Sequence, residues 1–264
     1  MISVYFTHSA GECITTLLKY NMDGEDKFPL HSAVRENKEL TVRSILRTSP
    51  AVVFQRDDDS RTALFWAVST GHPALVQLLL TTAKENSSSK HEFDIDDCDE
   101  AGWTVAHVAS SVGHEEIMEM ILAYEPDLTV QTNAGQTALH YAVSKGRLEI
   151  ARRLAEACPA AVRIRDKRGL LPLHRAAAIG SVPLIKLLIE PPARGPINTT
   201  DKDRWSPLFH ASAEGHGDAA LALLRAGADP DLRDSEGHSF LDVAPDDKVR
   251  TWIKDNAKRD GIDL

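Results

Sequence analysis

The chain has 264 residues, of which 42% are hydrophobic and 26% are charged, so it is long enough for one extended folded domain. Its formal net charge of -9 argues against a general affinity for nucleic acid or for an anionic membrane, because both attract basic surfaces. No stretch approaches the roughly 20 apolar residues of a membrane span. We therefore expect protein partners, with no nucleic acid and no membrane among them.

The first residues lie outside any repeat. Residues 1–10 lack the basic start and apolar core of a secretion signal. The three cysteines of the chain stand far apart without a Cys-x-x-Cys pair, as expected of reduced thiols in the cytosol or nucleus. The run from Cys13 to Leu18 leaves two interpretations of the N-terminal extension, residues 1–24: a short helix that caps the first repeat, or a loose terminus.

A diluted Thr-Pro-Leu-His tetrapeptide recurs along the rest of the chain. Successive copies are separated by 34, 42, 33, 34, 35 and 33 residues. This period is typical of a solenoid of stacked helix pairs, and it predicts about seven repeats. The leucine position of the tetrapeptide is occupied in turn by Leu30, Leu64, Ala106, Leu139, Leu173, Leu208 and Leu241.

Each copy predicts two short helices followed by a hairpin. In the fourth copy, Thr137 precedes an apolar run as a capping residue and Gly146 closes it. The following segment, residues 148–154, has an apolar stripe at helical spacing. Asp-x-x-Gly sequences, such as the one from Asp99 to Gly102, predict tight hairpins between repeats. Because one helix pair cannot bury its own stripe, stacking of neighbouring repeats must supply the core.

One interval of 42 residues breaks the period. It contains a polar, serine-rich run, residues 81–93, which predicts an extended hairpin or loop inserted between ordinary repeats. The repeat domain is expected to cover residues 25–253, with residues 254–264 as a C-terminal tail.

The sequence offers little sign of catalysis. Four of the eleven histidines occupy the tetrapeptide position, where a histidine can bridge the capping hydroxyl and the backbone of the neighbouring hairpin. No nucleophile elbow and no distinctive carboxylate pair is present. We therefore expect no enzyme, no catalytic residue, no cofactor and no metal. The four histidines are His31, His107, His140 and His174.

Residues 25–253 resemble the ankyrin repeat family, most closely in the copy that begins at Pro172. The resemblance implies an all-α solenoid of helix-turn-helix repeats with short hairpin loops. It also implies that hairpin tips and the exposed sides of the first helices line one surface, here called the concave face, on which partners bind.

Several side chains at concave or hairpin positions are candidates for partner binding. Trp103 and Trp205 directly precede capping residues, and Trp66 lies in a first helix where leucine is usual. Large aromatic side chains dominate many interfaces, but these rings could instead pack on neighbouring hairpins, and both interpretations stay open. Charge is also segregated: residues 92–127 hold eleven acidic and no basic residues, whereas residues 145–175 hold nine basic and three acidic residues, including Lys145, Lys167 and Arg168.

The wording of three segments is closer still, and it resembles the gankyrin family of seven-repeat ankyrin proteins. These segments are residues 59–67, 139–145 and 172–180, and residues 205–220 resemble its fungal members. The resemblance implies a chaperone for assembly of the proteasome regulatory particle, which grips the C-terminal domain of one AAA ATPase subunit of the base. It places Arg61 and Lys145 in the binding face, and we expect their reversal to Glu to weaken binding while barely changing the thermal midpoint.

One motif departs from this family. Animal members carry a Leu-x-Cys-x-Glu motif that is associated with binding of the retinoblastoma protein, and the corresponding stretch here runs from His210 to Glu214. That activity is not expected, although Glu214 stays among the candidate partner-binding residues. The resemblance also implies a cytoplasmic and nuclear protein that is a monomer when free. The alternative is an ankyrin adaptor or inhibitor of a kinase or a transcription factor, since one fold serves many functions.

Overall fold

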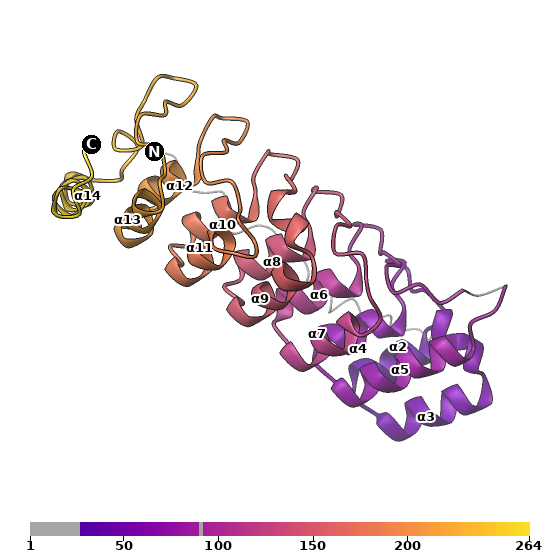
Figure 1. Ribbon diagram of the computed structural model, residues 1–264. Helices are drawn as coiled ribbons and strands as arrows, with labels where there is room; N and C mark the ends of the chain where they lie inside the picture. Colours follow the sequence, from indigo (N-terminus) through magenta and orange to yellow (C-terminus); the bar gives the residue numbers. More distant parts are fainter. Residues whose placement is uncertain (1–26, 90–91) are drawn as a thin grey trace.

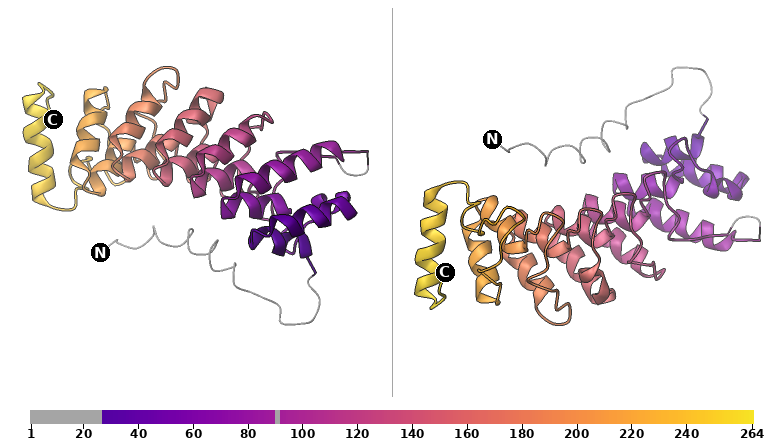
Figure 2. Two further views of the ribbon diagram at one scale, coloured as in Figure 1. Left: turned by 90° about the horizontal axis from the view of Figure 1, so that it is seen from below. Right: turned by 90° about the horizontal axis from the view of Figure 1, so that it is seen from above.

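The computed structural model describes residues 27–89 and 92–264. Within them the protein is all-α, as predicted, and its helices form pairs that stack in a row with the hairpins projecting to one side (Figure 1). Figure 2 shows the same row from two further directions, with α14 at one end and α3 near the other. The predicted N-terminal extension lies outside the described residues. None of the described helices is long and apolar enough to cross a lipid bilayer.

Six repeats have two helices each. The first helices lie next to the hairpins and the second helices form the outer side of the stack. Short 3-10 helices, η2 (Pro50–Phe54) and η3 (Pro159–Arg163), follow two of the second helices. The first helices are α2 (Pro29–Arg35), α4 (Ala63–Thr70), α6 (Val105–Val112), α8 (Ala138–Ser144), α10 (Pro172–Ala178) and α12 (Pro207–Ala213). The second helices are α3 (Glu39–Thr48), α5 (Pro73–Glu85), α7 (Glu115–Leu122), α9 (Leu148–Ala157), α11 (Val182–Ile189) and α13 (Gly217–Arg225).

The core runs along the whole stack between the two layers of helices. In α9 the apolar stripe is buried, including Ile150 and Leu154, while Arg153 faces outwards. Leu139 and Leu173, from the tetrapeptide position of two neighbouring repeats, are almost completely buried. Each repeat therefore buries its apolar side chains against its neighbours, as expected of a solenoid.

The last repeat differs from the others. The segment that corresponds to its first helix forms turns, in which the Asp242 carboxylate accepts hydrogen bonds from the N–H and the hydroxyl of Ser239. Pro245 follows, and it disfavours the helical conformation of the residue before it. Asp246 then caps α14 (Asp247–Arg259) by accepting from the N–H of Val249. The predicted boundary at residue 253 lies inside this helix.

The insertion is partly helical. Residues 81–85 extend α5 by more than a turn, and Ala83 is buried there. Further on, the Phe93 ring packs edge to face on Tyr124, with centroids 5.7 Å apart, and Ile95 is buried. The insertion was predicted as a hairpin or loop throughout, because its polar composition hides the anchoring residues Ala83 and Phe93; Ile95 lies just beyond it.

Candidate protein-binding face

Five of the hairpins in the described residues are built around one aspartate carboxylate, which is buried except in Asp57, and Thr132 takes this place in the remaining hairpin. In the hairpin between the second and third repeats, one oxygen of Asp99 accepts the backbone N–H groups of Ala101 and Trp103, both at 2.9 Å. Asp166 and Asp201 do the same in later hairpins, again for the residues two and four positions on. A buried carboxylate that accepts several N–H bonds is well satisfied. Each hairpin is therefore held in one rigid shape.

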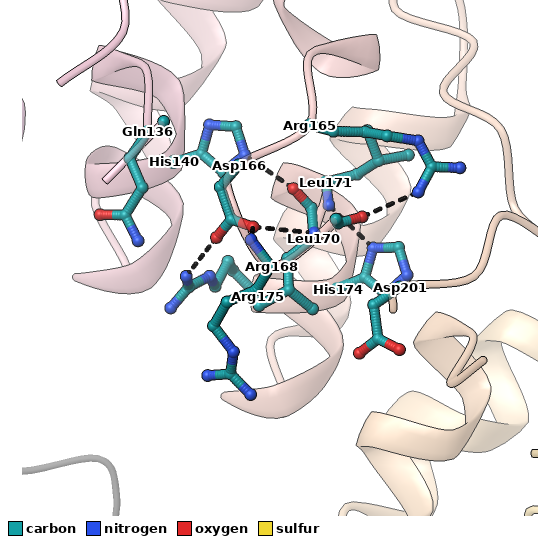
Figure 3. A network of polar contacts seen from close by, with 12 residues as sticks. Gln136, His140, Arg165, Asp166, Arg168, Leu170, Leu171, His174, Arg175 and Asp201 are labelled. Atoms are coloured by element: carbon teal, nitrogen blue, oxygen red, sulfur yellow. Dashed lines mark hydrogen bonds and ion pairs between the residues drawn. The ribbon is translucent and has the colours of Figure 1, made fainter. Parts of the chain in front are cut away.

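In three of the hairpins, the second oxygen of the aspartate ties the hairpin to a first helix. Asp57 accepts from the indole N–H of Trp66 at 2.8 Å. Asp166 accepts from the Arg175 guanidinium at 2.7 Å (Figure 3), and Asp201 lies 2.9 Å from Nε2 of His210. In all three cases the partner follows nine residues after the aspartate. The concave face is thus a row of hairpins anchored to the helices behind them.

Histidines join one repeat to the next, as predicted. His140 Nδ1 accepts from the N–H of Thr137, and its Nε2–H donates to the carbonyl oxygen of Leu170 at 3.1 Å (Figure 3). His107 bridges Thr104 and Gln136 in the same way. Burial lowers the pKa of both histidines from 6.5 to about 4. With this pKa the rings are uncharged near neutral pH, and both nitrogens of each ring are hydrogen-bonded within the protein. Their role is therefore structural.

The three candidate tryptophans are all packed against their neighbours. Trp66 is only 7% exposed, and the guanidinium of Arg35 lies 5.0 Å from its ring centroid. Trp103 is half-buried and packs against Tyr141 in a tilted arrangement, with ring centroids 4.2 Å apart. Trp205 is half-buried as well, and it packs on His210. The internal-packing interpretation thus describes Trp66, while Trp103 and Trp205 pack internally and also keep an exposed part.

Arg61 is committed to an internal ion pair. Its Nε and Nη2 atoms lie 3.0 Å and 2.9 Å from one oxygen of Asp99, whose side chain is 2% exposed. The Arg61 side chain is itself only 21% exposed. Removing one member of such a pair leaves an uncompensated buried charge. The ion pair therefore leads us to expect that reversal of Arg61 lowers the thermal midpoint, in contrast to the expectation from sequence.

The other charged candidates are exposed. Lys145 and Glu214 stand at the ends of α8 and α12, and Lys167 and Arg168 form the tip of one hairpin. None of these four side chains makes an ion pair in the part of the chain that the structure describes. They are therefore available to a partner, which sets Lys145 apart from Arg61.

Comparison with known proteins identifies the family of the chain. A model of three ankyrin repeats matches residues 1–90, 84–166 and 156–234. The chain belongs to the ankyrin repeat family. This match spans most of the described helix pairs.

Two fungal proteins are similar to the ankyrin chain over nearly their whole length. The "Probable 26S proteasome regulatory subunit p28" of Saccharomyces cerevisiae is 40% identical over 233 residues, which are 87% of this chain and 98% of that protein. The "Ankyrin repeat-containing protein C6C3.08" of Schizosaccharomyces pombe is 38% identical over 239 residues, 89% of this chain and 98% of that protein. The predicted resemblance is therefore confirmed.

Two solved structures share the ankyrin fold. The ankyrin repeat domain of Bcl-3 superposes with a TM-score of 0.68 at 27% identity, covering 88% of this chain and 99% of that domain. The human ASB11 ankyrin repeat domain superposes with a TM-score of 0.72 at 20% identity, covering 85% of this chain and 96% of that domain.

Sequence reasoning missed three side chains of the concave face. Tyr141, Arg175 and His210 line it in neighbouring repeats, each half-buried and each aligned with a hairpin residue nine positions earlier. The signal was present, because the spacing from the hairpin aspartate to the first helix is constant. The tetrapeptide alone does not reveal these residues, because they lie outside it.

Charge changes along the hairpin tips. The first tips are acidic, the third is neutral, the next two are rich in lysine and arginine, and the last is acidic. A partner on this ankyrin face therefore meets an ordered series of charges, which favours one orientation of binding. In chain order the charged or central tip residues are Asp58 and Asp59, Glu100, Asn133, Lys167 and Arg168, Lys202, Asp203 and Arg204, and Glu236.

Groups of histidine, cysteine, aspartate or glutamate that could hold a metal ion do not occur among the described residues.

Proposed function

We propose that this chain is a non-enzymatic assembly chaperone of the 26S proteasome regulatory particle. It binds the C-terminal domain of a AAA ATPase subunit of the base through its concave face. The observation that carries the proposal is the 40% identity over 98% of the yeast protein whose name is Probable 26S proteasome regulatory subunit p28. The rigid, exposed hairpin face supports it, because rigid repeat arrays are built to hold protein partners.

The mechanism in this proposal is steric and electrostatic. Buried carboxylates and histidines fix the hairpins before binding, so little conformational freedom is lost when a partner docks. The exposed charges Lys145, Lys167, Arg168 and Glu214 set the orientation of the bound domain. While bound, the chain shields that domain or delays its docking on another particle. In this proposal the free protein is a monomer in the cytoplasm and nucleus.

The proposal is tested by titrating the isolated C-terminal domain of the ATPase into the native chain and into Lys145→Glu. Loss of one desolvated charge pair weakens binding by about 2 kcal/mol or more. Lys186→Glu is the matched control, because Lys186 is also an exposed lysine but lies on α11, a second helix. We expect tight binding by the native chain and the control, and weak binding by Lys145→Glu. No binding of the domain by the native chain would reject the proposal in favour of the adaptor alternative.

A further inference from the structure

Two neighbouring hairpin tips carry four cations, here called the basic ridge. Lys167 and Arg168 lie on one tip, and Lys202 and Arg204 on the next. All four side chains are exposed, and within residues 27–89 and 92–264 none has an ion pair or a side-chain hydrogen bond. The backbone N–H of Lys202 donates to the carbonyl oxygen of Arg168 at 3.1 Å, so the two tips are directly adjacent.

Nearby carboxylates leave most of this charge uncompensated. Asp166 and Asp201 are buried, and they are occupied by their own hairpin amides and by Arg175 and His210. Asp203 is exposed between Lys202 and Arg204, so the ridge keeps a clear excess of positive charge. Behind it, the Arg165 guanidinium donates to the carbonyl oxygen of Thr200, which adds a further cation without a carboxylate.

Arg204 occupies a backbone position that ordinarily belongs to glycine. The fourth residue of the other Asp-x-x-Gly or Thr-x-x-Gly hairpins is Gly102, Gly135, Gly169 or Gly237, with φ between 76° and 87°. Arg204 has φ 62°, in the left-handed region that a residue with a Cβ atom rarely adopts. Backbone strain of this kind persists only where the surrounding structure enforces it, and it clusters at functional sites. The Arg204 side chain makes no ion pair and no hydrogen bond within the described residues that would account for it.

The hydrogen bonds between adjacent hairpin tips are longer next to the two non-glycine residues. Three glycine hairpins accept a backbone N–H from the next tip at 2.9 to 3.1 Å. A Cβ atom at Gly169 would lie 3.2 Å from the backbone nitrogen of Lys202, so the tips are already in tight contact. Next to Arg204 the corresponding bond, from Ser235 N–H to the Asp203 carbonyl, lengthens to 3.4 Å. Next to Ser60, the only other non-glycine residue at this position among the described hairpins, it is 3.3 Å.

We propose that the basic ridge binds an acidic segment of a protein partner, and that Arg204 is kept at a cost in stability because it contacts that segment. The inference rests on the proposed function and deepens it. It names the chemistry of the partner surface that meets the concave face at the hairpins before the fifth and sixth repeats. Side-chain carboxylates of glutamate and aspartate are the ligands. Guanidinium and ammonium groups bind them by charge-assisted hydrogen bonds.

An acidic peptide fits this ridge better than a nucleic acid. The tips at Glu100 and Glu236 are acidic, so the positive stretch ends after two repeats instead of following a long phosphate backbone. The chain as a whole carries a net charge of -9, which disfavours polyanions that extend beyond the ridge.

The test uses the full chain and a capped oligoglutamate peptide, followed by NMR chemical-shift titration. We expect shifts centred on residues 167–168 and 202–204. Arg204→Gly removes one exposed charge, so it should weaken peptide binding about two- to fivefold. It also relieves the left-handed conformation, so it should raise the thermal midpoint by about 2 °C or more. A variant that is more stable and binds less tightly is the signature of a residue kept for binding.

Ser60→Gly is the matched control, because it relieves the same backbone strain in another hairpin without removing a charge. It should raise the thermal midpoint and leave peptide binding unchanged, whereas Arg204→Lys should keep most of the binding. The inference is overturned if Arg204→Gly binds the peptide as the native chain does, if the shifts lie elsewhere, or if a single-stranded oligonucleotide binds more tightly than the peptide. Because the probe is not the ATPase domain, these outcomes are independent of those that test the proposed function.

Discussion

At the scale of single residues, Arg61 and Lys145 show how similar sequence signals can hide different environments. Both are basic residues at positions that the family resemblance places in the binding face. Arg61 is held by the buried carboxylate of Asp99, whereas Lys145 is exposed at the end of α8. Only the structure separates the two, because the partner of Arg61 lies 38 residues away in another hairpin.

Arg61→Glu is expected to destabilise the fold. It replaces the cation with a second negative charge beside Asp99, which is 2% exposed, and breaking a buried pair in this way costs about 3 kcal/mol. Urea unfolding monitored by circular dichroism measures this free energy. Lys145→Glu, at an exposed site, should stay within about 0.5 kcal/mol of the native chain. Equal stability of both variants and the native chain would show that the pair with Asp99 has no structural weight.

For the candidate tryptophans, the sequence indicated which residues to consider but not what their side chains contact. It named Trp66, Trp103 and Trp205 from their place in the period, and in the structure each contacts a hairpin or first-helix side chain. It did not show that Trp66 donates to Asp57, since such packing depends on side chains that meet only after the repeats stack. Their contact with a partner stays a prediction.

At the scale of elements, the histidines of the first helices make stability depend on pH. Burial lowers the pKa of His107 and His140 from 6.5 to about 4, and that of His174 to about 3. The unfolded chain therefore binds more protons than the folded chain below pH 6.5. It follows that the stabilisation is complete above pH 6.5 and is lost as the pH falls towards 4.

His140→Gln should make stability less sensitive to pH in this window. Each buried histidine contributes a slope on the order of 1 kcal/mol per pH unit between pH 6.5 and 4. Chemical unfolding at several pH values would measure the slope for the native chain and the variant. The carboxylates with lowered pKa, such as Asp166 and Asp201, lose their contribution only below about pH 4, outside the window. An unchanged slope in the variant would contradict the account.

Helix α14 closes the stack, and its length can be tested by truncation. Ending the chain after residue 253 removes about half of the helix with the buried Ala257, and it also removes the following Asp260, whose carboxylate pairs with Arg225. We expect faster hydrogen exchange in α13 and a lower thermal midpoint. A chain that ends after Ile262 loses only two exposed residues and should behave as the native chain does. Native exchange rates in the shorter chain would mean that residues 254–264 are a dispensable tail, as the sequence suggested.

Regular elements were predictable because capping residues, glycines and apolar stripes recur at a fixed period. The exceptions are the extension of α5, the turns that replace the first helix of the last repeat, and the end of α14. In the two helices, a tertiary contact overrides local composition: Ala83 is buried in a polar run, and Ile253 and Ala257 are buried in an otherwise charged helix. The turns instead follow from the local hydrogen bonds between Ser239 and Asp242 and from Pro245.

At the scale of the whole molecule, the described repeats form a continuous stack in which each unit packs mainly on its neighbours (Figure 1). Stability is then a sum of repeat and interface terms, so the ends open more easily than the middle. The binding face, in contrast, depends on the order of the hairpin tips along the full stack. A partner that spans several tips reads both the shape and the sequence of charges.

The most direct test of this account is a hydrogen-exchange footprint of the complex between the native chain and the C-terminal domain of the ATPase subunit. We predict protection of the hairpin tips and of the ends of the first helices, including Lys145, Lys167 and Arg168, with no change in α5, α9 and α11. Protection confined to those second helices would contradict the claim that the concave face holds the partner.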